Sequence, residues 1–157
     1  MKIKEIMRIK PFAVHQHDNL DQAAQVMWEQ DLGAIPIIDD NSHVIGMITD
    51  RDIAMGAYTQ GRPLAEIPVE SSMSKSLYCC ELSDEIDKAQ ELMRKHQVRR
   101  IPVLDNGKKL VGMLSLNDIA LAYATRSKKD IKADAVADTL AAVSRHRPQL
   151  HIAQHVA

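Results

Sequence analysis

The chain has 157 residues, of which 45% are hydrophobic, enough for one ordinary domain or for two very small domains that share a core. Lys and Arg number 20 against 21 Asp and Glu, so the net charge of -1 provides no basic footprint for nucleic acid or a membrane surface. No apolar run reaches the roughly 20 residues of a membrane helix, and the adjacent pair Cys79 and Cys80 fits neither a CxxC motif nor a disulfide framework. We therefore expect a soluble, cytoplasmic protein.

The first predicted elements, in chain order, are a short strand, a helix, two strands and a second helix. An apolar stretch at 12–14 precedes the helix-start signal Asp18 and a helical stripe made of Leu20, Ala23, Ala24 and Met27. Apolar runs at 35–38 and 44–48 follow, and the turn-rich residues 39–42 between them indicate a hairpin. A second helix is expected to begin near Asp50. The predicted order is β-α-β-β-α.

The same order is predicted again in the second half of the chain. A strand at 78–80 precedes Ser83-Asp84 and a helical stripe made of Ile86, Ala89, Leu92 and Met93. Strands at 101–104 and 110–114 and a helix from about Leu116 complete it. Sliding the sequence by 66 residues aligns 1–58 with 67–124 without a gap, and 13 of 58 positions are identical, against roughly three or four expected by chance at typical residue frequencies. The chain is therefore an internal duplication.

A single unit of this size buries too little surface to be stable alone, so we expect the two units to pack together in an α+β fold. We place the first repeat at 1–66 and the second at 67–126, with the crossover marked by 61–63 and 67–68. Residues 127–157 lie outside the repeat and contain a predicted helix from about 130 to 144, whose apolar stripe is Ile131, Ala135, Val136, Leu140 and Val143. Docking on its own repeats or across a dimer is preferred; recognition of a separate effector protein is the alternative.

One motif, G-x-[IL]-[TS]-x-x-D-I, occurs at 46–53 and again at 112–119. Gly46 and Gly112 permit the close approach of another backbone or of a ligand. The step from strand to helix exposes amide N–H groups at a helix N-terminus, which attracts anions. Taken alone, the T-x-x-D pattern is most simply a capping box. A cap does not require the glycine, or the Ile-Pro pair ten residues before it, and the whole pattern recurs at one offset, which favours a ligand site.

These residues resemble the cystathionine-β-synthase-type (CBS) domain family, in the small bacterial form that is little more than one CBS pair, over about residues 1–124. The resemblance implies tandem repeats packed about a pseudo-two-fold axis, known as a Bateman module. It also implies that the motif residues hold the ribose hydroxyls of AMP, ADP, ATP or S-adenosylmethionine; in this chain they are Thr49, Asp52, Ser115 and Asp118. A carboxylate accepts two vicinal hydroxyl protons well but would repel a phosphate.

The phosphate therefore needs a different partner, and the candidates are Arg51, Arg99 and Arg100, because guanidinium groups match phosphate oxygens in pairs. Solvated surface charge is the alternative reading of these arginines. Phe12 aligns with Tyr78, and either ring could stack on adenine, although core packing is the preferred use of both. The Ile-Pro prolines, Pro36 and Pro102, are further candidates for the base pocket. Since Arg51 aligns with Asn117, and Arg99-Arg100 with Gly33-Ala34, the two clefts are predicted to differ.

Other reactive residue types form no recognisable site in the sequence. The histidines at 15, 17, 43, 96, 146, 151 and 155 show no consistent ligand spacing, so no metal site is predicted. Serines and cysteines lack an identifiable base, and there is no G-x-S-x-G or P-loop motif, so no catalytic residue is nominated. Trp28 follows the stripe residue Met27, and a place in the core or at a helix interface is expected.

The sequence thus predicts a regulatory module that senses an adenosine-containing nucleotide, is a homodimer, requires no cofactor and reports to an effector protein not identified by the sequence. A ligand-independent scaffold, in which the T-x-x-D elements are only helix caps, is the first alternative. An enzyme that acts on a nucleotide is the second, without positive support in the sequence.

Overall fold

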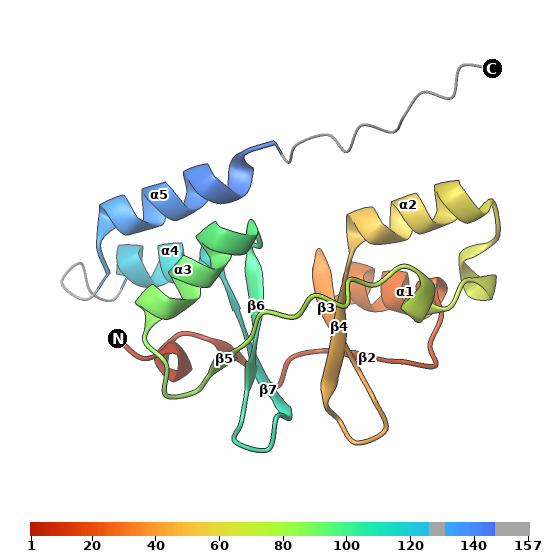
Figure 1. The fold of residues 1–157 in the computed structure, drawn as a ribbon, viewed down its shortest axis with the longest axis horizontal. Helices are drawn as coiled ribbons and strands as arrows, with labels where there is room; N and C mark the ends of the chain where they lie inside the picture. Colours follow the sequence, from red (N-terminus) through yellow and green to blue (C-terminus); the bar gives the residue numbers. More distant parts are fainter. Residues whose placement is uncertain (126–130, 147–157) are drawn as a thin grey trace.

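The computed structural model describes residues 1–125 and 131–146, and both repeats have the predicted β-α-β-β-α order (Figure 1). The first repeat contains β2 (Val14–His15), α1 (Leu20–Gln30), β3 (Ala34–Ile38), β4 (Val44–Thr49) and α2 (Asp50–Gln60). The second contains β5 (Cys80–Glu81), α3 (Ile86–His96), β6 (Arg100–Leu104), β7 (Leu110–Ser115) and α4 (Leu116–Thr125). The predicted α+β fold is therefore confirmed.

Each repeat forms its own small sheet. In the first, the strand order is β2-β3-β4, with β2 parallel to β3 and β3 antiparallel to β4. In the second, the order is β1-β7-β6-β5, with the same parallel and antiparallel pairs and one added edge strand, β1 (Arg8–Ile9). Pro36 of β3 and Pro102 of β6 precede the residues that pair with β2 and β5. No strand pairs with these prolines on the β2 or β5 side, so their missing N–H donor breaks no hydrogen bond there.

The first helix of each repeat begins one residue later than its acidic start signal suggests. Asn19 is the N-cap of α1: its side chain accepts from the N–H of Gln22, whose side chain accepts from the N–H of Asn19. Asp18 instead holds the preceding turn, because its carboxylate accepts from the N–H of His15. The predicted stripes are buried at Leu20, Ala23 and Met27, and at Ile86, Ala89 and Met93, whereas Ala24 and Leu92 are only half-buried.

The leading segments of the two repeats are exchanged. Ile3, in the short 3₁₀ helix η1 (Ile3–Glu5), is fully buried in the core of the second repeat, and β1 pairs there with β7. Val69, in η3 (Val69–Ser71), is buried in the core of the first repeat, and Ser74 pairs there with Met47 of β4. A third 3₁₀ helix, η2 (Leu64–Glu66), lies in the connection. The sequence repeat and the packing unit are thus not the same set of residues.

The bridges between the repeats reveal the symmetry of the pair. His43 forms an isolated antiparallel bridge with Lys109, and these two positions are equivalent at the 66-residue offset. The bridges Asn19–Pro68 and Lys2–Glu85 also map onto one another at that offset. A residue that pairs with its own equivalent lies beside a two-fold axis, so the expected pseudo-two-fold arrangement is observed.

Helix α5 (Ala133–Ser144) lies across α3 and α4 of the second repeat (Figure 1). Val143 and the preceding Ile131 are buried in the core of that repeat. The predicted stripe is wrong at Leu140, which is 55% exposed; Thr139 is buried in its place. Its hydroxyl donates to the carbonyl of Ala135 and accepts from Arg94, so burial leaves no polar atom of this side chain unsatisfied.

None of the helices in the described ranges is long and apolar enough to cross a membrane.

Candidate functional site

The first motif forms a complete capping box at the start of α2. The N–H and the hydroxyl of Thr49 both donate to Oδ2 of Asp52, at 2.9 and 2.8 Å. The N–H of Asp52 donates back to Oγ1 of Thr49 at 3.1 Å. Both side chains are half-buried, and Oδ1 of Asp52 takes part in no hydrogen bond with any described residue. One carboxylate oxygen thus holds the helix end, and the other is available to an incoming hydroxyl.

The second motif repeats this geometry at the start of α4. The N–H and hydroxyl of Ser115 donate to Oδ2 of Asp118 at 2.8 and 2.6 Å, and the N–H of Asp118 donates to Oγ of Ser115 at 3.1 Å. The cap predicted as the simpler reading is therefore present in both repeats. A cap that uses one oxygen of each carboxylate is compatible with a ligand at the other.

The motif glycines make room for the exchanged segments. A Cβ atom on Gly46 would lie 2.5 Å from Sδ of Met73 and 3.1 Å from the carbonyl oxygen of Ser74. A Cβ atom on Gly112 would clash with Sδ of Met7 in the same way. Of the two uses expected for these glycines, close approach of another chain segment is the one that the described residues display.

Arg100 extends from the second repeat to the motif of the first. Its Nη1 and Nη2 atoms each lie 3.6 Å from the place where a Cβ atom of Gly33 would be, and Oδ2 of Asp50 lies 3.3 Å from the same place. Asp50 is the first residue of α2 and follows Thr49. No hydrogen bond or ion pair with a described residue occupies the Arg100 guanidinium. The sequence did not decide which of the two clefts this arginine serves. The structure places it beside the first motif.

The other two arginine candidates are less constrained. Arg51 lies in the first turn of α2 and is exposed, with its backbone N–H bonded to Oδ1 of Asp50. Arg99 is exposed, and its carbonyl accepts from the N–H of Leu116 at the start of α4. The structure therefore brings Arg100, but not Arg99, against the first motif. A Cβ atom on Gly33 would meet Arg100 at an ordinary van der Waals distance, so this glycine is not a signal that sequence reasoning could have used.

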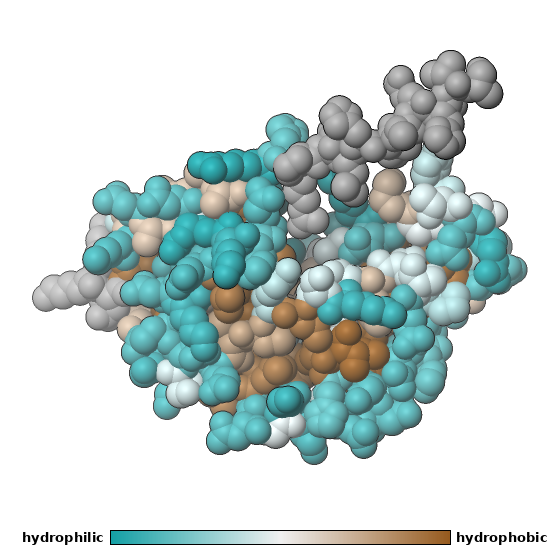
Figure 2. Space-filling model, viewed as in Figure 1, coloured by the Kyte–Doolittle hydropathy of each residue, from teal (hydrophilic) through white to brown (hydrophobic). Residues whose placement is uncertain are grey.

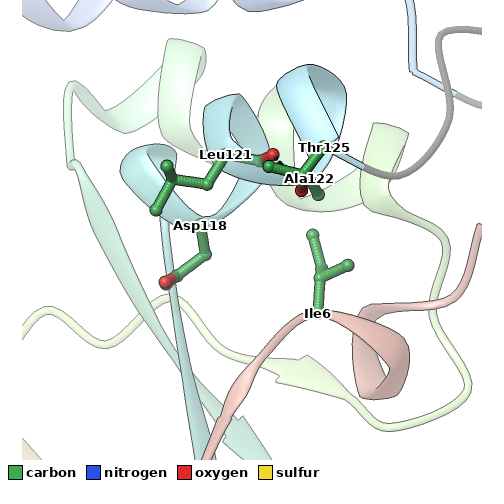
Figure 3. A pocket seen from close by; sticks show the side chains of 5 residues that line it. All are labelled: Ile6, Asp118, Leu121, Ala122 and Thr125. Atoms are coloured by element: carbon green, nitrogen blue, oxygen red, sulfur yellow. Dashed lines mark hydrogen bonds between the residues drawn. The ribbon is translucent and has the colours of Figure 1, made fainter.

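Two open cavities border the motif helices. One, of about 550 Å³, is lined by residues of α1 and α2 and the connection before β3: Ala24, Met27, Trp28, Asp31, Leu32, Gly33, Asp50 and Ile53. The other, of about 210 Å³, is lined by Asp118, Leu121, Ala122 and Thr125 of α4 and by Ile6 (Figure 3). Figure 3 shows Ile6 pointing toward α4 from the exchanged N-terminal segment. The first cavity shares Gly33 and Asp50 with the surroundings of Arg100.

The aromatic and proline candidates are distributed differently from expectation. Core packing, the preferred use of Phe12, is wrong, because its side chain is 45% exposed. Tyr78 is half-buried and stacks on His96 with ring centroids 3.6 Å apart. Pro36 and Pro102 are buried in β3 and β6. A core position for Trp28 is also wrong: it is 89% exposed, because it lies about 100° around the helix from the buried Met27.

Apolar surface is concentrated between the two repeats. Figure 2 shows hydrophobic residues gathered across the middle of one face, over the strands of both sheets, with hydrophilic residues around them. The motif ends of β4 and β7 lead out of this region into α2 and α4.

The cysteines show no sign of activation. Burial, and next the nearby Asp84 carboxylate, raise the pKa of the Cys80 thiol to about 11, and burial raises the pKa of Cys79. At neutral pH the buried thiol is therefore protonated, whereas a nucleophilic cysteine needs its thiolate.

Comparison with known proteins agrees with this architecture. The family model for the CBS domain matches residues 3–56 and 64–125. CBS domain-containing protein YhcV of Bacillus subtilis is 34% identical over 119 residues, which are 76% of this chain and 83% of that protein.

Two solved structures have the same fold. Hypoxic Response Protein I with two coordinated zinc ions has a TM-score of 0.71 and 33% identity, over 77% of this chain and 98% of that one. The CBS domain pair of protein MJ0100, in complex with 5-methylthioadenosine and S-adenosyl-L-methionine, has a TM-score of 0.72 and 23% identity, over 81% of this chain and 98% of that one. The chain belongs to the CBS domain family and carries two CBS domains in tandem.

Proposed function

We propose that this protein is a cytoplasmic regulatory module that binds an adenosine-containing nucleotide, AMP, ADP, ATP or S-adenosylmethionine, between its two CBS domains. The observation that carries the proposal is the pairing, at one cleft, of a half-buried carboxylate with one available oxygen and an arginine contributed by the other repeat. The CBS pair of MJ0100, which has the same fold, was solved with two adenosine derivatives, which supports this class of ligand.

The ribose is assigned to the motif carboxylates. Asp52 and Asp118 each keep Oδ1 outside the capping box, and an acceptor of this kind suits vicinal hydroxyls. Thr49 and Ser115 supply the neighbouring hydroxyl groups. The glycines Gly46 and Gly112 act indirectly, because they set how closely the exchanged segment approaches each strand.

A phosphate is assigned to Arg100, with Arg51 at the same helix end, whereas the exposed Arg99, the third candidate, is not placed against the first motif and is given no main role. The N-terminus of α2 adds a favourable potential for an anion, while the exposed Asp50 opposes it. Arg100 therefore has to provide the main attraction, and its guanidinium has no competing partner among the described side chains. The second cleft has Ala34 at the equivalent position and so lacks this contact.

Adenine is assigned to the apolar surface between the repeats. Phe12 is exposed enough to stack on a base, and Pro36 and Pro102, buried in β3 and β6, stay candidates for the base pocket. Tyr78 already has one face against His96, which leaves at most its other face for a ligand. Because the ligand would contact both repeats, binding would favour one relative arrangement of them, and that preference would be the signal.

The test is nucleotide-dependent thermal stability combined with calorimetry, using AMP, ADP, ATP and S-adenosylmethionine. Wild-type protein should melt higher with at least one of them, by RT ln(1 + [L]/Kd) in free energy. Asp52→Ala with Asp118→Ala should lose this response and also part of the basal stability. Asp52→Glu with Asp118→Glu is the matched variant: glutamate suits a capping box, so basal stability should remain while the displaced carboxylate loses the ribose.

Wild-type protein that responds to none of the four ligands would overturn the proposal. So would a Glu double variant whose response equals that of wild type, because the carboxylates would then serve only as caps.

A ligand-independent scaffold is the second candidate, and the complete capping boxes are what favours it. An enzyme is not proposed: burial raises the pKa of the Cys80 thiol to about 11, and the hydroxyls of Thr49 and Ser115 are engaged in the helix caps. Both remaining candidates share a proposed homodimer, supported by exposed apolar side chains of α1 and α2, Trp28, Met55 and Tyr58. Light scattering of wild type and of Trp28→Glu with Tyr58→Glu tests the dimer: the variant should be monomeric, and a monomeric wild type would contradict it.

A further inference from the structure

Two histidines and an aspartate come together at the hairpin end of the first repeat, away from the motif helices. Nε2 of His15 lies 3.1 Å from Oδ1 of Asp40, and Nε2 of His17 lies 3.8 Å from the same oxygen. The ligand atoms of the three residues all lie within 4.8 Å of one another. We propose that His15, His17 and Asp40 bind a divalent first-row transition-metal ion, for which Zn²⁺ is the probe.

The two histidine-to-carboxylate separations are close to those that a metal imposes. With Zn–N and Zn–O bonds of about 2.0–2.2 Å, neighbouring ligand atoms of a tetrahedral ion lie about 3.4 Å apart. Both histidine-to-carboxylate distances are within half an ångström of that value. Two imidazoles and one carboxylate suit zinc, copper, nickel or cobalt better than magnesium or calcium, which prefer oxygen ligands. The position left open would take water.

The backbone on both sides of the cluster is fixed in advance. On the strand side, Asp18 accepts from the N–H of His15 at 2.7 Å, which closes the turn after β2. On the hairpin side, Asp39 accepts from the N–H groups of Asn41 and His43 at 2.9 and 2.8 Å, which fixes the loop that carries Asp40. The three ligands therefore need only side-chain adjustments to close around an ion.

The cluster is open to solvent and has one further neighbour. The side-chain amide of Gln16 contacts Nε2 of His17 at 3.4 Å. His17 and Asp40 are exposed, so an ion reaches the cluster from solvent without opening the fold.

The second repeat holds the same backbone without the ligands. Asp84 accepts from the N–H of Glu81 at 2.8 Å, and Asp105 accepts from the N–H groups of Gly107 and Lys109 at 2.8 and 2.9 Å. At the 66-residue offset, Glu81, Ser83 and Asn106 stand where the first repeat has His15, His17 and Asp40. The same backbone geometry thus carries the two histidines in the first repeat only. The side chains of the second repeat therefore provide matched control substitutions.

The experiment is calorimetric titration of the untagged, chelator-treated full chain with ZnCl₂ in the absence of nucleotide, checked by native mass spectrometry. Wild type should bind one Zn²⁺ at this site. The variant His15→Glu, His17→Ser, Asp40→Asn, which places the second repeat's own side chains on the first scaffold, should lose that ion. His43→Ala, which removes a neighbouring histidine outside the cluster, should keep it. All three proteins keep the histidines at 96, 146, 151 and 155, so zinc bound by these residues is common to the three titrations.

A reciprocal graft makes the proposal falsifiable even if the triple variant is unstable. Glu81→His, Ser83→His and Asn106→Asp in wild type should raise the stoichiometry from one to two. A wild type without zinc binding, a triple variant that binds as wild type does, or loss of binding in His43→Ala would each overturn the proposal. None of these outcomes depends on nucleotide binding, so the two proposals fail separately.

Discussion

The two CBS repeats share a backbone plan and differ in what surrounds it. In the first repeat, α1 and α2 expose Trp28 and Tyr58, and the first turn of α2 is charged by Asp50 and Arg51. In the second, α5 covers α3, and Leu116, the equivalent of Asp50, is buried. The first repeat thus has a polar helix end and exposed helices, whereas in the second repeat α5 covers the equivalent helix. Equal folds therefore do not imply equal sites.

The largest effect that tests this contrast is expected where α5 covers the second repeat. Ile131→Ala should lower the free energy of unfolding by about 2–5 kcal/mol, because Ile131 is fully buried in that core. Leu140→Ala, on the exposed side of the helix α5 that follows Ile131, should change it by less than about 0.5 kcal/mol. Chemical denaturation measures both. Equal effects of the two substitutions would mean that α5 is not an integral cover.

The next effect concerns the two clefts. Arg100→Ala should weaken AMP or ATP binding by roughly 10- to 100-fold, the loss of a charged hydrogen-bond pair to phosphate. S-adenosylmethionine has no phosphate, so its affinity should change little. Arg99→Ala is the matched control, since Arg99 is exposed and not placed against the first motif. Calorimetry with both ligands measures the difference; an equal loss in the two variants would remove the distinction between clefts.

The third effect is a loss of stability at alkaline pH that comes from the second repeat alone. Cys80 aligns with Val14, and both are buried. The pKa of the folded-state thiol is raised to about 11, above its unfolded value of about 8.5. Between these values the unfolded chain releases the thiol proton first, so stability should fall as pH rises through this window and be unaffected by the thiol below it.

Cys80→Val should remove that contribution, because it gives the second repeat the side chain of the first. Urea denaturation from pH 7 to pH 10.5 gives the free energy of unfolding of wild type and of Cys80→Val. Because both proteins contain the same lysines, lysine titration cancels in the difference between the two free energies. Parallel stability curves would show that the thiol does not titrate as described.

The bodies of the repeats were predictable because local pattern and repeat register agree. Strands 35–38 and 44–48 were expected within one residue of β3 and β4, and the second helices begin at Asp50 and Leu116 as predicted. The exchanged segments were not predictable. Ile3 and Val69 occupy equivalent apolar positions, and nothing in their local sequence says which of two similar cores receives them.

The candidate site was predictable only in part, because some of its geometry is local to one chain segment and the rest depends on how the two repeats pack. The capping geometry at Thr49 follows from spacing along one chain segment, and the structure reproduces it. The position of Arg100 depends on how the repeats face each other, which sequence periodicity does not encode. Thr139 was missed because periodicity selects apolar residues, whereas a threonine that bonds to its own helix and to Arg94 is also at home in a core.

The exchanged segments bear on how such a chain could have arisen and how it can be divided. Two separate copies of one repeat that traded these segments would form an interlocked dimer. Joining the end of one copy to the start of the other then preserves every contact. By the same reasoning, fragments 1–62 and 63–157 would each carry the leading segment that is buried in the core of the other, and mixing them should rebuild the molecule without the connecting peptide bond.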